Sequence, residues 1–118
     1  ERWGGLDGGG TLAFARSVNP DKQQRHLRKT YQEGKSFLDS LADAQEVLDA
    51  YHSGNYRLIS EEAWRSRVTI EVLSVEGRYI NVNNPKGMQD INEASNIFII
   101  EGIKSPKVYP VNRAKGYR

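Results

Sequence analysis

The spacing of apolar residues changes once along this chain, from a helical period to a strand period, and this change limits the possible folds most. Between residues 36 and 52 the apolar side chains lie three or four positions apart: Phe37, Leu41, Ala44, Leu48 and Tyr51. This spacing puts them on one face of a helix. We therefore expect a helix from Ser36 to about His52. Asp39, three residues after Ser36, gives its start the form of a capping box.

After Gly54 the apolar residues alternate with a period of two, which is typical of strands. We expect strands over 67–73, 78–82, 96–101 and 107–111, with a shorter one at 56–59. The second is expected to follow the first directly, through residues 75–77. The strand at 96–101 is apolar on both faces, which favours a central position, and Pro110 puts the last strand at an edge or ends it.

Because the helices precede the strands, the expected fold class is α+β with an antiparallel sheet of about four strands. Five glycines before residue 11 indicate a flexible lead-in or linker over 1–20, followed by a single domain over 21–118. Leu12, Ala13, Phe14 and Val18 could still dock against that domain. The chain begins at Glu1 and not at Met, so we interpret it as a fragment, such as the C-terminal domain of a longer protein. No run of 18 apolar residues predicts a membrane span.

The charges are unevenly distributed, although the net charge is only +2. Residues 36–66 carry two Lys or Arg against six Asp or Glu, whereas the segments before and after this one are basic. This distribution can give a domain with one basic and one acidic face. The alternative is an ordinary mixed surface. The expected helix has an acidic outer face, which we interpret as a solvated surface or as a site for a partner.

The densest run of phosphate-binding side chains lies at residues 22–30, where nine residues include five basic or imidazole groups. Pro20 and Gly34 suit the start and the end of a helix from Asp21 to about Gly34. In such a helix Lys22, Arg25 and Lys29 lie near one stripe. With His26 among them, the run predicts a polyanion site that also does chemistry. The alternative is that His26 is an ordinary surface residue.

Several kinds of catalysis find no support in the sequence. There is no cysteine, the two histidines lie 26 positions apart without metal-binding spacing, and no GxSxG motif is present. We therefore expect neither a metal nor a cofactor. Metal-free RNA cleavage needs only a base, an acid and cations, because the ribose 2′-OH is the nucleophile. The candidates for these roles are His26 with Arg25 and Thr30, Glu71 and Arg78, and Glu101, Lys104 and Tyr109. Nucleic-acid binding without cleavage is the alternative.

The segment from Lys22 to Tyr31 resembles the opening of the bacterial polymorphic toxin type 50 domain, of the form KQ-x-RH-(I/L)-x-x-T. The likeness continues through residues 33–36 and the 43–51 helix, and more weakly at 98–100 and 108–112. Such domains occur at the C-terminal ends of large secreted bacterial proteins, including contact-dependent growth inhibition effectors, and in phage head-associated proteins. The closing strands of the family often carry two histidines; this chain has Glu101 at one place and Val108 or Tyr109 at the other.

This resemblance implies a barnase/EndoU/colicin/RelE-like fold, in which N-terminal helices pack on a twisted antiparallel sheet. It implies a toxin that cleaves tRNA, is delivered as the tip of a larger protein, acts in the target-cell cytoplasm, and binds as a monomer to a cognate immunity protein, which we expect to be acidic. A phage-structural domain remains the alternative. If the domain is an RNA-cleaving toxin, His26 is the general base or acid and Glu101 is its partner base. Arg25 and Lys104 hold the scissile phosphate, and Thr30 or Tyr109 orients the phosphate or ribose. The other candidate RNA-binding residues are Lys22, Arg78 and Lys107.

Overall fold

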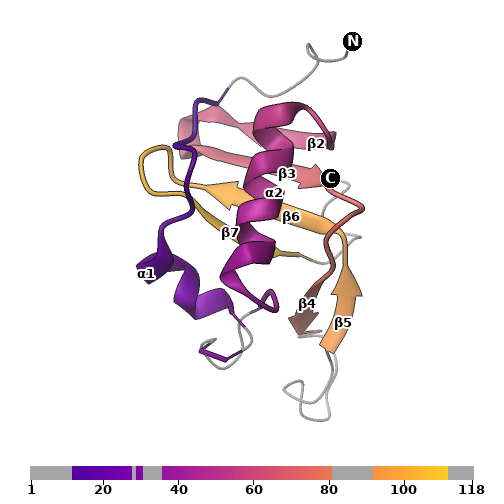
Figure 1. The fold of residues 1–118 in the computed structure, drawn as a ribbon. Coiled ribbons are helices and arrows are strands. Elements are labelled where there is room, and N and C mark those ends of the chain that lie inside the picture. Colours follow the sequence, from indigo (N-terminus) through magenta and orange to yellow (C-terminus); the bar gives the residue numbers. More distant parts are fainter. Residues whose placement is uncertain (1–11, 28, 31–35, 81–91, 112–118) are drawn as a thin grey trace.

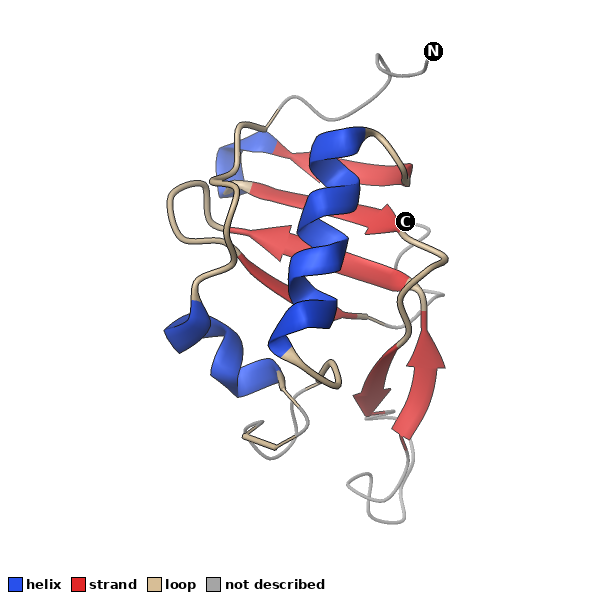
Figure 2. Cartoon of the chain, viewed as in Figure 1, coloured by secondary structure: helices blue, strands red, loops and turns tan. Residues whose placement is uncertain are grey.

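The computed structural model describes residues 12–27, 29–30, 36–80 and 92–111 of the 118-residue chain. The described part contains helices packed against a four-stranded antiparallel sheet, with a second sheet of two strands beside it (Figures 1 and 2). The α+β class expected from the sequence is therefore confirmed. The helices are α1 (Pro20–Gln23) and α2 (Leu41–Ser53), with 3-10 turns η1 (Gln24–His26) and η2 (Ala63–Arg65). The strands are β2 (Arg57–Glu62), β3 (Arg67–Glu71), β4 (Gly77–Ile80), β5 (Asn92–Ser95), β6 (Ile97–Glu101) and β7 (Lys107–Pro110).

The strand order of the larger sheet is β2-β3-β6-β7, and every neighbouring pair in it is antiparallel. β6 lies between β3 and β7, as its two apolar faces predicted. β7 is at an edge, as predicted from Pro110, which pairs with Phe98 of β6. Both expectations hold because a mainly apolar strand is buried best with a neighbour on each side, whereas an edge strand tolerates a residue without an N–H group.

Helix α2 begins at Leu41, so the predicted start at Ser36 is wrong. Ser40 is the N-cap, and its hydroxyl accepts a hydrogen bond from the backbone N–H of Asp43. Phe37 and Leu38 are instead extended and form bridges with Arg78 and Leu27. Phe37 fits the helical stripe in sequence, yet it reaches the interior from an extended segment. The end is as expected, because Gly54 takes the left-handed conformation with a φ of 85°.

The predicted helix over 21–34 is also wrong after its first two turns. Pro20 opens α1, and the Asn19 side chain accepts from the N–H of Lys22, but helical structure ends at His26. Leu27 is extended and pairs with Leu38, while the N–H of Leu38 donates to the carbonyl of His26 at 2.7 Å. This tertiary pairing takes the carbonyl that a longer helix would use. The predicted stop at Gly34 lies outside the described residues.

The strand predicted at 78–82 forms as β4, but it does not join the main sheet. It pairs with β5, which the sequence did not predict, and its last two predicted residues lie outside the described ones. The chain turns away after β3, where the side chain of Asn96 donates to the Val75 carbonyl at 2.7 Å. The segment predicted as a short strand at 56–59 forms as the longer strand β2 and takes the edge position beside β3.

The core lies between α2 and one face of the sheet (Figure 1). From the helix it contains Ala44, Val47, Leu48, Ala50 and Tyr51, and from the strands Val68, Ile70, Phe98, Ile100 and Val108. Phe14 and Val18 are buried in the same cluster, so the docking of this N-terminal segment that the sequence allowed is observed. Two backbone bonds hold the segment, from Ala15 N to Ile103 O and from Asn19 N to Pro106 O, each 2.8 Å long.

Candidate active site

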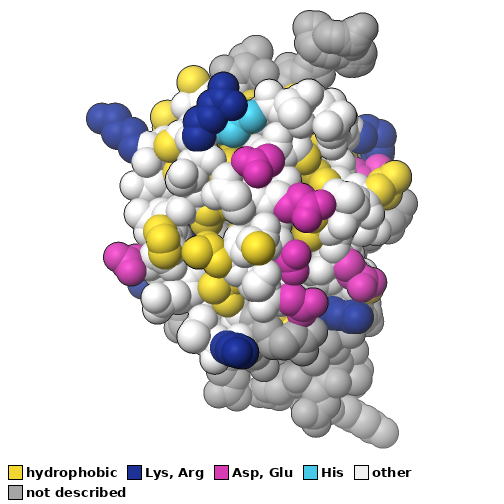
Figure 3. Space-filling view, viewed as in Figure 1, with side chains coloured by type: hydrophobic (Ala, Val, Ile, Leu, Met, Phe, Trp, Pro, Cys, Tyr) yellow, Lys and Arg dark blue, Asp and Glu magenta, His cyan; other side chains and the backbone are white. Residues whose placement is uncertain are grey.

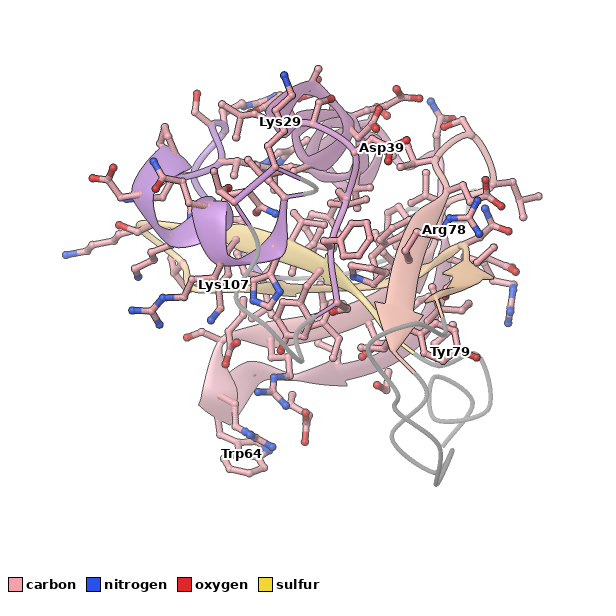
Figure 4. All side chains as sticks on the ribbon, turned by 90° about the horizontal axis from the view of Figure 1, so that it is seen from below. Lys29, Asp39, Trp64, Arg78, Tyr79 and Lys107 are labelled. Carbon is pink, nitrogen blue, oxygen red and sulfur yellow. The ribbon has the colours of Figure 1, made fainter. Side chains whose placement is uncertain are left out.

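The two faces of the four-stranded sheet carry different side chains. Successive residues of a strand point to opposite faces. On β6, Phe98 and Ile100 belong to the core under α2, so Ile99 and Glu101 lie on the other face. In Figure 4 the described helices lie on one side of the sheet, which leaves this second face to strands and loops. The candidate site lies on that face.

A row of alternating charges crosses all four strands on this face. The register pairs Glu62 with Arg67, Arg67 with Glu101, and Glu101 with Lys107. The shortest contact joins Arg67 Nη2 to Glu101 Oε2 at 3.0 Å, and the other two ion pairs measure 4.0 Å. Burial disfavours the charged form of Glu101, but the hydrogen bond from Arg67 and the charges of Arg67 and Lys107 outweigh it and lower the pKa of the Glu101 carboxyl. Glu101 is therefore an ionised carboxylate at neutral pH.

Tyr109 connects this charged row to His26. Its hydroxyl donates to Glu101 Oε1 at 3.3 Å, and its ring stacks on the imidazole of His26, with centroids 4.8 Å apart and planes 20° apart. The ammonium group of Lys107 lies 5.7 Å from the centroid of the same phenol ring. Burial, followed by the charge of Glu101, raises the pKa of Tyr109 to about 12, so the phenol stays neutral and keeps its proton.

His26 is buried, with 6% of its surface exposed, and a hydrogen bond from one ring nitrogen sets its orientation. Nδ1 lies 2.9 Å from the carbonyl oxygen of Ser36. A carbonyl oxygen can only accept, so this bond assigns the proton of the neutral ring to Nδ1 and the lone pair to Nε2. A histidine held in this way has the tautomer that a general base needs.

Gln23 fixes the distance between His26 and the sheet. Its side chain is fully buried, donates to the carbonyl of Val108 at 2.6 Å and accepts from the N–H of Val108 at 2.7 Å. Val108 is on the edge strand β7, so this amide takes the place of a neighbouring strand. Because Gln23 immediately precedes η1, the pairing holds His26 beside Tyr109. Nothing in the sequence distinguishes Gln23 from the exposed polar residues around it.

The structure brings four of the predicted site residues together: His26, Glu101, Lys107 and Tyr109. Arg67 joins them, although sequence reasoning treated it only as the start of a strand. A signal for it existed, since the register of β3 and β6 places it opposite Glu101. Register is hard to derive from sequence alone, because a slip of one residue exchanges the two faces of a strand.

The remaining predicted residues lie around or away from this group. Lys22 and Arg25 are exposed on α1 and η1, and Lys104 is exposed on the turn between β6 and β7. The hydroxyl of Thr30 donates to the carbonyl of Gln24 at 2.8 Å, so it closes the turn after His26. Arg78 lies on β4 across the view from Lys107 in Figure 4, with its guanidinium 3.8 Å from Glu76.

Glu71 lies at the far end of β3 from Arg67 and forms an ion pair with Arg57 at 2.7 Å. In Figure 3 acidic side chains gather on the face of the domain that α2 covers, whereas the charged row lies on the sheet face that points away from α2. Burial there, followed by the charges of Asp39 and Glu46, raises the pKa of Asp43. The two charged surfaces are thus separated by the sheet and the helix.

Two absences concern only the part of the chain that the structure describes. In that part, no three His, Asp or Glu side chains gather closely enough to hold a metal ion. No helix in it is long and apolar enough to cross a membrane.

The fold and this group of side chains define a small α+β domain whose sheet has one apolar and one charged face. His26 lies next to the charged face, oriented by its hydrogen bond to the Ser36 carbonyl. The chain belongs to the bacterial toxin 50 family, whose family model matches residues 18–93. It is therefore a polymorphic toxin domain, as its resemblance predicted. The match includes His26 and Arg67 and ends before Glu101, Lys107 and Tyr109. No curated protein matches the sequence.

Proposed function

We propose that this toxin domain is a metal-independent endoribonuclease that acts on tRNA. The observation that carries the proposal is the group formed by His26, Tyr109, Glu101, Arg67 and Lys107. It joins an imidazole, a phenol, a carboxylate and two cations from segments up to 83 positions apart in sequence. These are the side-chain types that RNA cleavage through the ribose 2′-OH requires.

In the proposed reaction the ribose 2′-oxygen attacks the adjacent phosphorus, and the bond from phosphorus to the 5′-oxygen breaks. A base takes the 2′-OH proton and an acid returns a proton to the 5′-oxygen, which leaves a 2′,3′-cyclic phosphate and a 5′-hydroxyl. Nε2 of His26 supplies one of these proton transfers. The lowered pKa of Glu101 makes it a weak base, so its main role is to orient Tyr109, Arg67 and Lys107.

The cations of the site stabilise the crowded phosphate as its charge grows in the transition state. Lys107 is part of the group itself, and Arg25 on η1 and Lys104 on the β6–β7 turn are exposed on adjacent elements. We include both in the proposed phosphate-binding set. Thr30 contributes indirectly, through the turn that it closes after His26.

Membership of a polymorphic toxin family supports two further parts of the proposal. The domain is delivered into a target cell as the tip of a larger protein and acts on the tRNA in its cytoplasm. A cognate immunity protein, expected to be acidic, binds the toxin as a heterodimer and blocks it by covering the charged sheet face, because complementary charge speeds association.

The test is incubation of the purified domain with total bacterial RNA, with and without excess EDTA, analysed on a denaturing gel. We expect tRNA-sized fragments in both conditions, and a rate that falls roughly 10²- to 10⁴-fold in His26→Ala. His52→Ala is the matched control, since His52 is on α2, with Nε2 3.3 Å from the Ala15 carbonyl, and should cleave at the parent rate.

Loss of cleavage on chelation would contradict the metal-independent part of the proposal. Full activity in His26→Ala would remove His26 from the reaction. Intact RNA in every lane, together with salt-dependent RNA binding, would favour a nucleic-acid-binding module without catalysis. Intact RNA without such binding would favour the phage-structural alternative.

A further inference from the structure

Trp64 is the most exposed large apolar side chain among the described residues, with 81% of its surface in solvent. It lies in η2, the turn that joins β2 to β3, and projects from the sheet on the side away from the helices (Figure 4). Leu73 is almost as exposed, at 77%. A single exposed apolar residue needs no explanation by itself. Trp64 differs from Leu73 in its aromatic ring and in what surrounds it.

The turn that carries Trp64 is held to the sheet at the end where the charged row lies. Ser66 closes it in the left-handed conformation, with a φ of 51°, and its N–H donates to the Ala63 carbonyl at 3.0 Å. The carbonyl of Ser66 in turn accepts from the N–H of Gly102 at 3.0 Å, directly after Glu101 at the end of β6. The indole is therefore presented from a fixed turn next to the charged row.

One face of the indole is covered by a cation. The guanidinium carbon of Arg65 lies 5.4 Å from the centroid of a Trp64 ring, and Arg65 Nη1 lies 3.8 Å from Glu62 Oε2, the first member of the charged row. The charge of Arg65 also reaches Tyr109. Burial and Glu101 raise the pKa of that phenol, while Arg67 and Arg65 act in the opposite direction. The turn and the candidate active site therefore belong to one surface.

We propose that Trp64, backed by Arg65, is a stacking platform for an unpaired base of the RNA substrate beside the phosphate that is cut. This inference rests on the proposed function, because it assigns the substrate a second point of contact. Every base has a flat face that can stack on an indole whatever its identity, and the nearby guanidinium groups attract the phosphates on either side. The platform therefore binds single-stranded RNA without reading its sequence.

Neighbouring residues favour RNA over a protein as the occupant. A docking surface for a protein is normally a continuous apolar patch of several hundred Å². Trp64 instead stands between Ala63 and Arg65, with Glu62 and Arg67 next in line, so its surroundings are charged. An indole backed by a guanidinium, at the end of a row that also carries Arg67 and Lys107, suits the stacking of a single-stranded nucleic acid.

The test measures binding without cleavage, so that it does not depend on catalysis. A fluorescently labelled single-stranded 2′-O-methyl RNA, which lacks the attacking hydroxyl, is titrated with the whole domain. We expect Trp64→Ala to raise the Kd on the order of tenfold, within the roughly 5- to 150-fold range of base–aromatic stacking, and Trp64→Phe to stay within about threefold of the parent. Leu73→Ala is the matched control for an exposed apolar residue and should leave the Kd unchanged.

A second ligand separates stacking from charge. An oligonucleotide of the same length built only of abasic sugar-phosphate units keeps the charges and removes the bases. Trp64→Ala should bind it as tightly as the parent domain does, whereas Arg65→Ala should bind it more weakly. Since Trp64 is exposed, its replacement should leave the midpoint of thermal unfolding of the domain unchanged.

The outcomes distinguish this inference from the proposed function. If Trp64→Ala binds the 2′-O-methyl RNA as tightly as the parent, the stacking platform is excluded even where the domain cleaves RNA. If the variant binds more weakly and the parent domain cleaves no RNA, Trp64 is a stacking platform for single-stranded RNA, whereas the catalytic proposal fails and with it the placement of the platform beside a cleaved phosphate. An effect of Trp64→Ala only on self-association, or only on binding of an immunity protein, would also overturn the inference.

Discussion

The two faces of the four-stranded sheet serve different purposes, although successive side chains of each strand point alternately to one face and the other. On the face under α2, Phe98, Ile100 and Val108 are fully buried with the apolar side chains of the helix. On the other face Glu101 and Lys107 are partly exposed and lie in the charged row. Burial of apolar surface is the main stabilising contribution in a domain of this size. The first face therefore supplies most of the stability, which leaves the second free to hold the charged groups of the proposed active site.

The charged face stabilises the fold less than its number of contacts suggests. Arg67 Nε is buried and has no hydrogen-bond partner among the described residues, although the other end of the guanidinium binds Glu101. A buried donor without a partner costs about 1–3 kcal/mol, and ion pairs that are partly desolvated gain little overall. A sheet selected only for stability would replace this row with apolar residues. Its presence suggests that the row serves a function.

The sharpest test of this comparison uses two neighbouring isoleucines on opposite faces of β6. Ile100→Ala removes a fully buried side chain under α2 and should lower the free energy of unfolding by about 2–5 kcal/mol, measured by urea denaturation. Ile99→Ala changes the same residue type, but Ile99 is partly exposed between Thr69 and Tyr109. It should cost roughly half as much or less, because water already reaches the side chain.

The same pair of variants should separate stability from activity. When both proteins are folded, Ile99→Ala should lower the rate of RNA cleavage more than Ile100→Ala does, since Ile99 is paired with Tyr109. Equal losses of stability from the two variants would show that the two faces do not divide these roles.

The sequence allowed those parts of the fold to be predicted that depend on local pattern. The strands at 96–101 and 107–111 were placed in the sheet correctly, because an apolar run and a single proline determine their surroundings. The helix start at Ser36 was wrong, since Phe37 has the spacing of a helical stripe but is buried through pairing with Arg78. Such pairings between distant segments leave no periodic signal in the sequence.

The candidate site shows the same limit. Chemistry alone pointed to His26, Glu101 and Tyr109, because few side-chain types can transfer protons, and Lys107 was only one of several candidate cations for RNA binding. It did not separate these from Arg78, which is on the other sheet, and it gave no role to Arg67 or Gln23. The positions of these three follow from register and from one buried amide, both of which are properties of the folded chain.

Gln23 offers a test of how the helical segment is joined to the charged face. Gln23→Ala leaves both backbone groups of Val108 without their partner and should lower the free energy of unfolding by about 1–3 kcal/mol. It should also slow RNA cleavage, because η1 no longer holds His26 against Tyr109. Urea denaturation and the cleavage assay measure the two effects separately.

The matched control is Gln24→Ala, since Gln24 is the same residue type one position later and its side chain is exposed. Its backbone N–H donates to the Pro20 carbonyl and its carbonyl accepts from Thr30, and alanine keeps both groups. Gln24→Ala should therefore behave as the parent does. If the two variants behaved alike, the pairing with Val108 would have no part in holding His26 in place.

The smallest expected effect concerns the charge of Glu101 and its dependence on pH. The pKa of Glu101 lies below its ordinary value of 4.5 in the folded domain, so folding favours the ionised form. The stability that it contributes is present above about pH 4.5 and is lost as the pH falls through the lowered folded-state pKa. Because the Glu101 carboxylate is partly exposed and water screens its ion pairs, we expect a contribution of at most about 1 kcal/mol. Glu101→Gln should be less stable than the parent at pH 7 by about this amount.

The difference between the two proteins should shrink as the pH falls below 4.5, since the parent loses the charge that the variant never had. Urea denaturation at pH 7, 5 and 3.5 measures this change. Glu76→Gln is the control, because Glu76 forms an exposed ion pair with Arg78 on the other sheet. A constant difference between Glu101→Gln and the parent across this range would mean that Arg67 and Lys107 do not hold Glu101 ionised. The charged face would then be a set of solvated side chains, and its contrast with the apolar face would concern burial alone.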